Sequence, residues 1–98
     1  MRDEFEGSEW DRGKSERCLA ERGFDFAFAA RIFEESQYWE EPSRQEHAEP
    51  RFIAIGPVDE LLLTVVWTPH GRKRRIISAR RASRRERHAY RQIVESRG

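Results

Sequence analysis

The sequence has a single cysteine, Cys18, and no long run of apolar residues. One cysteine excludes a disulfide within the chain and a zinc site built from several cysteines, so Cys18 is expected to be a small core residue. A membrane-spanning helix needs about 20 apolar residues, and the acidic start "MRDEFEGSEW" lacks the apolar segment of a secretory signal. These absences predict a soluble, cytoplasmic protein with no membrane partner.

Motifs for several kinds of site are also missing. The chain has no glycine-rich phosphate-binding loop, no metal-binding cluster of His and Cys, and no Gly-x-Ser-x-Gly motif. His47, His70 and His88 fall in an expected loop, turn and helix, where a solvated histidine is more common than a ligand or a base. We therefore expect neither a metal nor another cofactor.

The net charge of +1 conceals two halves of opposite sign. Residues 1–50 hold seven Arg or Lys against fourteen Asp or Glu, whereas residues 51–98 hold twelve against four. Ten of the twenty residues from Arg72 to Arg91 are basic. This density predicts a surface that attracts polyanions, with an affinity that falls as salt rises. The alternative is that the two halves simply attract each other within the fold.

The length and composition suit one small domain. The 98 residues are 37% hydrophobic and 38% charged, so the core must be thin, although the aromatic residues supply large apolar side chains. We expect a single domain over residues 1–98, with its core at about residues 10–96. Residues 1–9 show no periodicity and are expected to be frayed.

A first helix is expected directly after these residues. Asp11 can cap a helix over residues 12–22, because its side chain can accept a hydrogen bond from an amide of the first turn. Gly23 can end the helix in the left-handed conformation that glycine adopts without strain. The apolar face of this helix is narrow and would consist of Cys18 and Leu19.

A second helix is expected to follow without a long connection. Asp25 is again a suitable cap, and the helix would reach about Glu35. Apolar residues recur in it at the spacing that forms one helix face. The residues of this face, which we expect in the core, are Phe26, Ala29, Ala30 and Phe33.

The centre of the chain is typical of strands. Residues 37–40 are a short candidate strand, and residues 41–50 form a polar, proline-bounded loop. Residues 51–56 and the nearly continuous apolar run 61–68 predict two further strands, and residues 75–80 a fourth. Because short connections join antiparallel neighbours, the expected fold is of the α+β class: two N-terminal helices, a small antiparallel sheet of three or four strands and a C-terminal helix.

The arginine-rich segment "RRIISARRASRRERHAY" contains the last strand and the start of the last helix. Strand alternation would place Ile76, Ser78 and Arg80 on one face, opposite Arg75, Ile77 and Ala79. After the strand, Ser83 and Glu86 match the capping box, in which each side chain bonds the backbone amide of the other, so a helix should begin near Arg84. Its apolar stripe would be Ala89, Tyr90, Ile93 and Val94.

The arginines of this segment are its chemically specific feature. Guanidinium keeps its charge at physiological pH and can bond two phosphate oxygens at once. Arginines fixed on a strand and on the helix after it could therefore hold a polynucleotide backbone or stabilise a phosphorane-like transition state. The strand arginines Arg75 and Arg80 are the candidates for a site, whereas Arg84, Arg85, Arg87 and Arg91 are also explained as residues that decorate the helix and raise the local potential.

Five stretches together resemble the BrnT family of type II toxin–antitoxin toxins: "EWDRGK", "FDFAFAARIFEE", "RFIAIG", "LLLTVVWT" and "RRIISARRASRRERHAY". The resemblance implies a RelE-like fold and a metal-independent endoribonuclease that inhibits translation. It also implies a ribbon-helix-helix antitoxin, BrnA-like, that neutralises the toxin and binds operator DNA in complex with it. The partners expected are thus RNA, this antitoxin and, through the complex, DNA.

The resemblance also suggests site residues. Those in matching positions are Lys14, Arg51, Arg75, Arg80, Arg81, Glu86 and Tyr90. We expect Arg51, Arg75, Arg80 and Glu86 to be catalytic. The residues expected to bind RNA, two of them from the charge of the last helix, are Lys14, Arg81, Arg84, Arg85 and Tyr90.

The chain departs from the family where a Lys-His-Gly sequence usually ends the first helix and Glu21-Arg22-Gly23 stands instead. A histidine that could transfer protons is therefore absent. RNA cleavage needs a base, cations at the phosphorus and an acid. Glu86 is a possible base, although its cap role explains it at least as well, and His47 or His88 could replace the lost histidine. The alternative function is a catalytically weak or inactive module that binds nucleic acid or the antitoxin.

Overall fold

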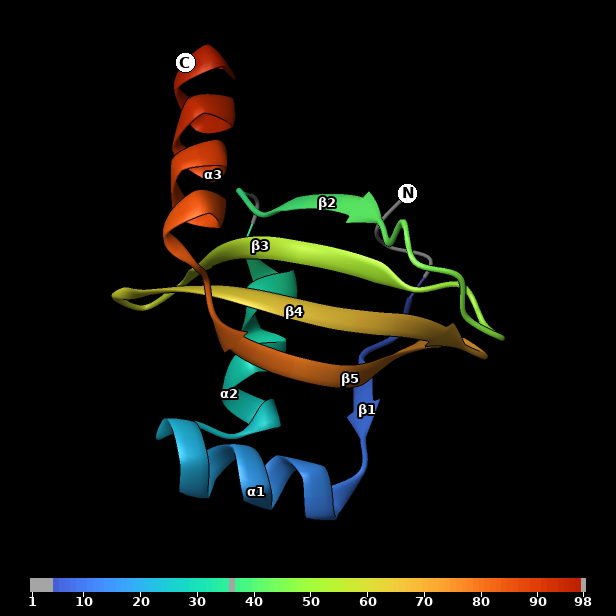
Figure 1. The fold of residues 1–98 in the computed structure, drawn as a ribbon. Helices are drawn as coiled ribbons and strands as arrows, with labels where there is room; N and C mark the ends of the chain where they lie inside the picture. Colours follow the sequence, from blue (N-terminus) through green and yellow to red (C-terminus); the bar gives the residue numbers. More distant parts are fainter. Residues whose placement is uncertain (1–4, 36, 98) are drawn as a thin grey trace.

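The computed structural model describes residues 5–35 and 37–97. In these residues, three α-helices and a short 3₁₀ helix combine with a sheet of five strands (Figure 1), which confirms the α+β class. The elements in chain order are β1 (Ser8–Trp10), α1 (Arg12–Arg22), α2 (Phe26–Ala29), the 3₁₀ helix η2 (Ala30–Glu34), β2 (Trp39–Pro42), β3 (Phe52–Val58), β4 (Leu61–His70), β5 (Lys73–Arg81) and α3 (Arg84–Arg97).

The sheet is mixed, with the strand order β1-β5-β4-β3-β2. Strands β2 to β5 pair as antiparallel neighbours, as predicted, but β1 adds a fifth strand that runs parallel to β5. The prediction of a purely antiparallel sheet of three or four strands was therefore incomplete. A strand of three residues is too short to show an alternating pattern, and its pairing depends on a partner more than sixty residues away.

The expectation that residues 1–9 are frayed is wrong for the part that the structure describes. Phe5 packs edge-on against Trp67, with ring centroids 5.2 Å apart. The Glu6 amide donates a hydrogen bond to the Arg72 carbonyl at 2.6 Å, and β1 follows. Residues 1–4 lie outside the described residues. The segment is held by aromatic packing and backbone pairing, which local sequence periodicity does not reveal.

The helices α1 and α2 and the 3₁₀ helix η2 pack on one face of the sheet, and the core lies between them and the strands (Figure 1). None of the described helices covers the opposite face, called here the open face; α3 projects away from the sheet beside β2. Residues at the centre of the core include Ala29, Ile32, Tyr38, Ala54, Leu63, Val65 and Ile76. The layer of helices thus leaves one side of the sheet available for a site.

Helix α1 has its predicted bounds and caps. Asp11 Oδ2 accepts a hydrogen bond from the Lys14 amide at 2.9 Å, and Gly23 ends the helix at φ 87°. Cys18 is buried, as predicted, and its thiol donates to the Ala79 carbonyl at 3.6 Å. Leu19 is 50% exposed, so its assignment to the core face was wrong. It lies about 100° around the helix from Cys18, which turns it away from the sheet.

The second helix is shorter and tighter than predicted. Asp25 Oδ1 accepts from the Phe28 amide at 2.9 Å, as expected of a cap, but α2 gives way to η2 after one turn. A 3₁₀ helix has three residues per turn, so the buried face continues at a spacing of three. The buried residues are accordingly Phe26, Ala29 and Ile32, whereas Ala30 and Phe33 are half-buried.

A β-bulge interrupts the pairing of β4 with β5. The register shifts between Val66 and Trp67, which face Ser78 and Ile76 respectively, so Ile77 is the extra residue. Because Ile77 has no partner on β4, the residues of β5 that follow it face the sides opposite to those that strict alternation predicts. The sequence pattern of β5 gives no sign of this change, since all of its residues suit an uninterrupted strand.

The bulge overturns the predicted facing of β5. Ile76 and Ala79 are both buried in the core, although they were expected on opposite faces. Ser78 and Arg80 are exposed on the open face, where they line a groove together with residues of β3 and β4. The bulge thereby presents Arg80 to the open face while it keeps Ile76 and Ala79 in the core.

The last helix begins as predicted. The Glu86 amide donates to Ser83 Oγ at 3.1 Å and the Ser83 amide donates to Glu86 Oε1 at 2.8 Å, which confirms the capping box. Of the predicted stripe, Tyr90, Ile93 and Val94 are half-buried and Ala89 is exposed. Among the described helices, none has the length and apolar character needed to span a membrane.

Candidate nucleic-acid interface

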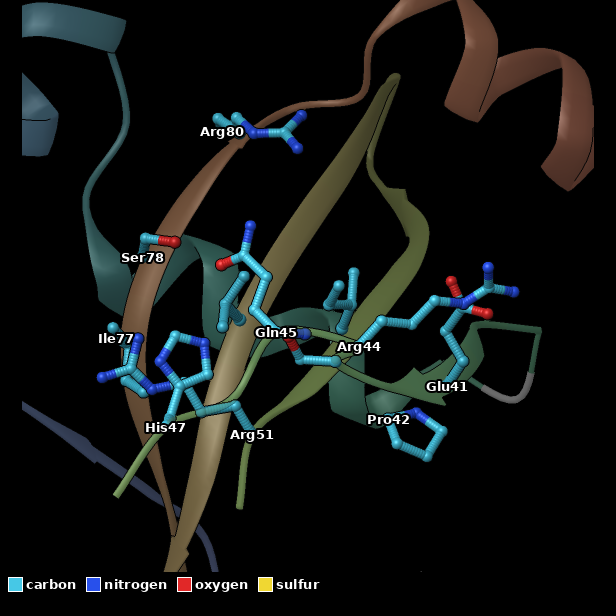
Figure 2. Close-up of a pocket in the computed structure, with 12 residues that line it drawn as sticks. Glu41, Pro42, Arg44, Gln45, His47, Arg51, Ile77, Ser78 and Arg80 are labelled. Carbon is cyan, nitrogen blue, oxygen red and sulfur yellow. The ribbon is translucent and has the colours of Figure 1, made fainter. Parts of the chain in front are cut away.

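Two hollows adjoin on the open face of the sheet. The first, of about 460 Å³, lies between the loop after β2 and the strands β3 to β5 (Figure 2). The second, of about 350 Å³, lies toward α1 and the turn between β4 and β5. Arg51 and Ile77 line both hollows, so the two hollows adjoin. Together they are called here the open-face groove. Its basic and histidine residues are Lys14, Arg44, His47, Arg51, His70, Arg75 and Arg80.

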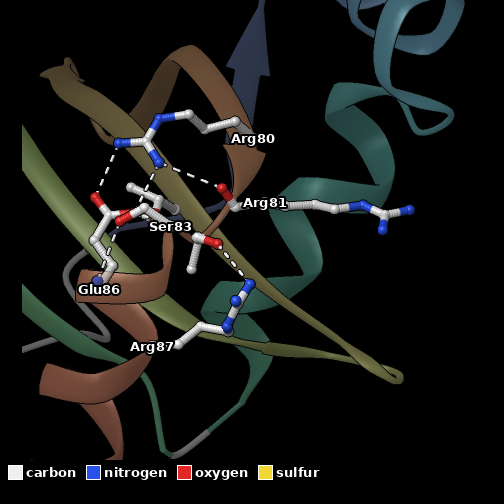
Figure 3. Close-up of polar contacts among 7 residues, drawn as sticks. Arg80, Arg81, Ser83, Glu86 and Arg87 are labelled. Carbon is white, nitrogen blue, oxygen red and sulfur yellow. Dashed lines mark hydrogen bonds and ion pairs between the residues drawn. The ribbon is translucent and has the colours of Figure 1, made fainter.

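Arg80 lies at one end of the groove and is fixed by Glu86 (Figure 3). Its two terminal nitrogens donate to Glu86 Oε1 at 2.7 Å and Oε2 at 2.9 Å, a bidentate pair. Glu86 also accepts from the Ser83 amide and from Thr64 Oγ1 at 3.0 Å. The cap of α3 therefore also orients Arg80.

The contacts of Glu86 determine its charge state. The hydrogen bond from Arg80 is the largest influence on its pKa; partial burial opposes it, and the Ser83 amide and Thr64 hydroxyl add to it. Together they lower the pKa of Glu86 to about 2. A carboxylate with so low a pKa is a weak base at neutral pH, so this geometry favours the cap role over the base role.

Arg75 lies in the second hollow, beside Glu9 of β1. One of its terminal nitrogens is 3.1 Å from Glu9 Oε2, and His70 Nδ1 is 2.7 Å from the same oxygen. Partial burial acts to raise the pKa of Glu9, but the hydrogen bonds and charges of Arg75 and His70 bring it below its usual value. The parallel pairing of β1 with β5, in which Glu9 faces Arg75, creates this contact.

Arg51 stands where the two hollows meet. Its Nε donates to Glu49 Oε2 at 2.9 Å, and one terminal nitrogen lies 2.8 Å from the same oxygen. The hydrogen bond from Arg51 lowers the pKa of Glu49. The preceding backbone is fixed as well, since Thr68 Oγ1 donates to the Pro50 carbonyl at 2.6 Å. Each of the three predicted catalytic arginines in the groove is thus paired with one carboxylate.

The structure gathers some predicted residues and separates others. Lys14 lines the second hollow with Arg51 and Arg75, although it comes from α1. Other predicted RNA-binding residues are not part of the groove lining: Arg81 points away from Arg80 (Figure 3), and Tyr90 donates from its hydroxyl to the Gln37 carbonyl at 2.7 Å. Arg84 and Arg85 are exposed on the first turn of α3.

Arg74 was not distinguished from its neighbours by the sequence, but it is only 6% exposed. Its guanidinium carbon lies 4.4 to 5.1 Å from the ring centroids of Phe5, Phe33 and Trp67. These rings hold the cation in the core on the helix-covered side of the sheet. Arg74 is therefore a structural residue, and the adjacent Arg75 faces the groove.

The carboxylates that hold the groove arginines were also missed by sequence reasoning. Glu9 and Glu49 are single acidic residues in an acidic half of the chain, so nothing local marks them. Only the sheet pairing of β1 and the turn before β3 bring them to Arg75 and Arg51. Among the described residues, no three or more His, Cys, Asp or Glu residues gather as a metal-binding group.

Glu21 and Arg22, which stand where the resemblance implies Lys and His, lie beside the groove. With Lys14 they line a shallow hollow next to β5 that also includes Ile77 and Ser78, two residues of the groove. Arg22 makes an exposed ion pair with Glu21 at 3.6 Å. Burial raises the pKa of the nearby Cys18 thiol, which disfavours the reactive thiolate. Arg22, at the position where the resemblance implies a histidine, thus lies close to the groove.

Comparison with protein families gives one match, and it covers most of the chain. The model of the family described as "Ribonuclease toxin, BrnT, of type II toxin-antitoxin system" matches residues 10–86 of the 98. This range runs from the end of β1 to the capping residue Glu86 and includes all the basic residues of the groove. No individually curated protein matches the chain.

Proposed function

The chain belongs to the BrnT family of ribonuclease toxins of type II toxin–antitoxin systems, and on this basis we propose that its open-face groove binds and cleaves RNA in the cytoplasm. Cleavage stops translation, and it proceeds without a metal. The observation that carries the proposal is the gathering of Lys14, Arg51, Arg75 and Arg80 along one uncovered face of the sheet.

The distribution of these cations suits a single strand of RNA. Lys14 comes from α1, Arg51 directly precedes β3, and Arg75 and Arg80 come from β5. Together they extend over two adjoining hollows, so successive phosphates can each meet a different cation. Glu49 and Glu9 neutralise Arg51 and Arg75 in the free protein. Both pairs are partly exposed, and exposed pairs contribute little free energy. A phosphate can therefore exchange with these carboxylates at low cost.

Arg80 has a different part in the proposal. Its bidentate partner Glu86 is held by the Ser83 amide and Thr64 as well, so this pair is rigid. A guanidinium held in place before the substrate arrives can stabilise the charge that develops on the phosphorane without reorganisation. Arg80 is the catalytic cation in this scheme, assisted by Arg51 and Arg75, and Glu86 positions Arg80.

Partners follow from the family. A type II toxin has a protein antitoxin that neutralises it. We propose that the antitoxin here is a BrnA-like ribbon-helix-helix protein and that the complex binds operator DNA. Arg81 at the end of β5 and Arg84 and Arg85 at the start of α3 are exposed outside the groove and are available for additional RNA contacts.

The test is RNA cleavage by the purified chain in the presence of a metal chelator, with growth arrest on expression without the antitoxin as a second readout. Removal of one charge-stabilising group typically costs about 100-fold or more in rate, so Arg80→Ala should abolish detectable cleavage and toxicity. Arg91→Ala, which removes an exposed arginine of α3, is the matched control. Intact RNA with a correctly folded wild-type chain would refute the proposal.

One observation favours a second candidate function, an inactive toxin-like module that binds nucleic acid or the antitoxin. Arg22 stands beside the groove where the resemblance implies a histidine, and Arg51, Arg75 and Arg80 are each paired with a carboxylate. Such a module would bind RNA without cleaving it. The cleavage assay separates the two functions, provided that binding is measured on the same RNA.

A further inference from the structure

His70 lies at the end of β4, at the edge of the open-face groove, and a carboxylate holds its ring. Its Nδ1 is 2.7 Å from Glu9 Oε2, while 68% of its side chain is exposed. Glu9 is held in turn by Arg75 at 3.1 Å and is 27% exposed. The contact therefore joins a fixed carboxylate of β1 to an imidazole that solvent and substrate can reach.

This contact determines which ring nitrogen carries the proton. The Glu9 carboxylate is ionised at neutral pH, because its pKa lies below the usual value. It can only accept a hydrogen bond, so Nδ1 of a neutral His70 must be the donor. Nε2 then has a free lone pair, and the carboxylate also stabilises the imidazolium that forms when Nε2 takes up a proton.

His70 also faces the cations that hold phosphate in the proposed function. It lines the second hollow with Lys14 of α1, Arg51 and Glu49 beside β3, and Arg75 of β5. Lys73 is its register partner across the β4–β5 turn. An RNA phosphate on Arg51 or Arg75 would thus lie beside a histidine with an available lone pair. The other candidate base, Glu86, accepts hydrogen bonds from three residues.

We propose that His70 is the general base of RNA cleavage in this chain and that Glu9 is the residue that positions it; this inference rests on the proposed function. Nε2 of His70 takes the proton of the ribose 2′-hydroxyl, and the 2′-oxygen bonds to phosphorus. The bond from phosphorus to the 5′-oxygen breaks, and water protonates that oxygen, which leaves hydroxide. The imidazolium returns its proton to the hydroxide, so the products are a 2′,3′-cyclic phosphate and a 5′-hydroxyl.

This assignment supplies the proton acceptor that the departure at Glu21-Arg22 removes. From the sequence, His70 was expected to be a solvated turn residue, because its partner Glu9 lies sixty-one positions earlier in the chain. Only the parallel β1–β5 pairing brings the two together. Charges of both signs surround the ring: Lys14, Arg75 and Glu49 line the same hollow, and Glu9 contacts Nδ1.

The test compares His70→Gln with the wild type over a range of pH, using the full chain and a single-stranded RNA. A general base contributes about 100-fold to 10,000-fold. His70→Gln should therefore lower kcat at least about 100-fold with little change in KM, and it should remove the rise of kcat with pH. Glu9→Gln should lower kcat less, because the ring loses the carboxylate that fixes its tautomer and orientation. His88→Gln, on the exposed side of α3, is the matched control.

A second measurement does not depend on turnover. Nitrogen NMR of the His70 ring should show the tautomer protonated at Nδ1 in the wild type and a shift toward the Nε2 tautomer in Glu9→Gln. Cleavage by His70→Gln at the wild-type rate, with Arg80→Ala inactive, would overturn this inference alone. A folded wild-type chain that cleaves no RNA would overturn the proposed function and this inference with it.

Discussion

At the scale of single residues, the groove depends on three carboxylates that each hold one arginine. Glu86 is the most strongly engaged of them, because it bonds Arg80 through both oxygens and also caps α3. Glu9 and Glu49 each use one oxygen. The differences in their contacts predict different responses to substrate and to acid.

The low pKa of Glu86 leads to a prediction about stability. A carboxyl whose pKa is about 2 in the folded chain and near 4.5 in the unfolded chain stabilises the fold above pH 4.5. This contribution, at most about 3 kcal/mol, should disappear as the pH falls from about 4.5 to about 2. Urea unfolding of wild type and Glu86→Gln should show a difference in stability at pH 7 that shrinks across this window.

The control for this prediction is Glu95→Gln, which alters an exposed carboxylate on the same helix. Its unfolding free energy should follow that of the wild type at every pH. An equal stability of Glu86→Gln and wild type at pH 7 would contradict the role assigned to Glu86. The comparison of variants is needed because Glu9 and Glu49 also have lowered pKa values and contribute to the acid sensitivity of the wild type.

At the scale of elements, the sequence predicted those parts of the fold that have a local signal. The caps Asp11, Asp25 and Ser83 each marked the start of a helix, since capping depends on a few adjacent residues. The bulge at Ile77 and the strand β1 had no such signal, because both are defined by pairing with distant residues. The pairing of β1 and the bulge in β5 bring Glu9 and Arg80 to the candidate site. The sequence therefore indicated which arginines to consider, but not how they are arranged or which carboxylates hold them.

The close approach of β3 to the segment before β2 gives a prediction at this scale. A Cβ on Gly56 would lie 2.6 Å from Tyr38 Cβ and 2.9 Å from Tyr38 Cα, and Tyr38 is buried. One of the two backbones must therefore move. Overpacking of this kind typically costs about 1–3 kcal/mol, and thermal unfolding of Gly56→Ala should show at least that loss. An unchanged melting temperature would mean that β2 shifts freely against β3.

At the scale of the whole molecule, the acidic and basic halves of the chain are only partly separated in space. The acidic half supplies Glu9 and Glu49 to the arginines of the basic half, which agrees with the alternative reading that the halves attract each other. The same arginines nevertheless line an open groove. In the proposed function, internal pairing and anion binding are therefore successive uses of the same cations, before and after RNA binds.

The number of cations that the proposed function assigns to phosphate predicts how the affinity for RNA depends on salt. Four phosphate contacts, at Lys14, Arg51, Arg75 and Arg80, give a slope of log K against log salt of about −2.8 for single strands. Lys14→Ala should reduce the slope by about 0.7, whereas Arg91→Ala should leave it unchanged. Filter-binding titrations at several salt concentrations measure both. A slope unaffected by Lys14→Ala would place the RNA outside the second hollow.

The parallel pairing of β1 with β5 has a consequence for the synthesis of the chain. Ser8–Trp10 is synthesised some sixty residues before its partner Arg74–Ile76. The contact of Glu9 with Arg75 and His70 therefore cannot form on a nascent chain until β5 has left the ribosome. A translation product that ends before β5 lacks the completed groove, so a ribosome that stalls before this strand releases fragments without the assembled site.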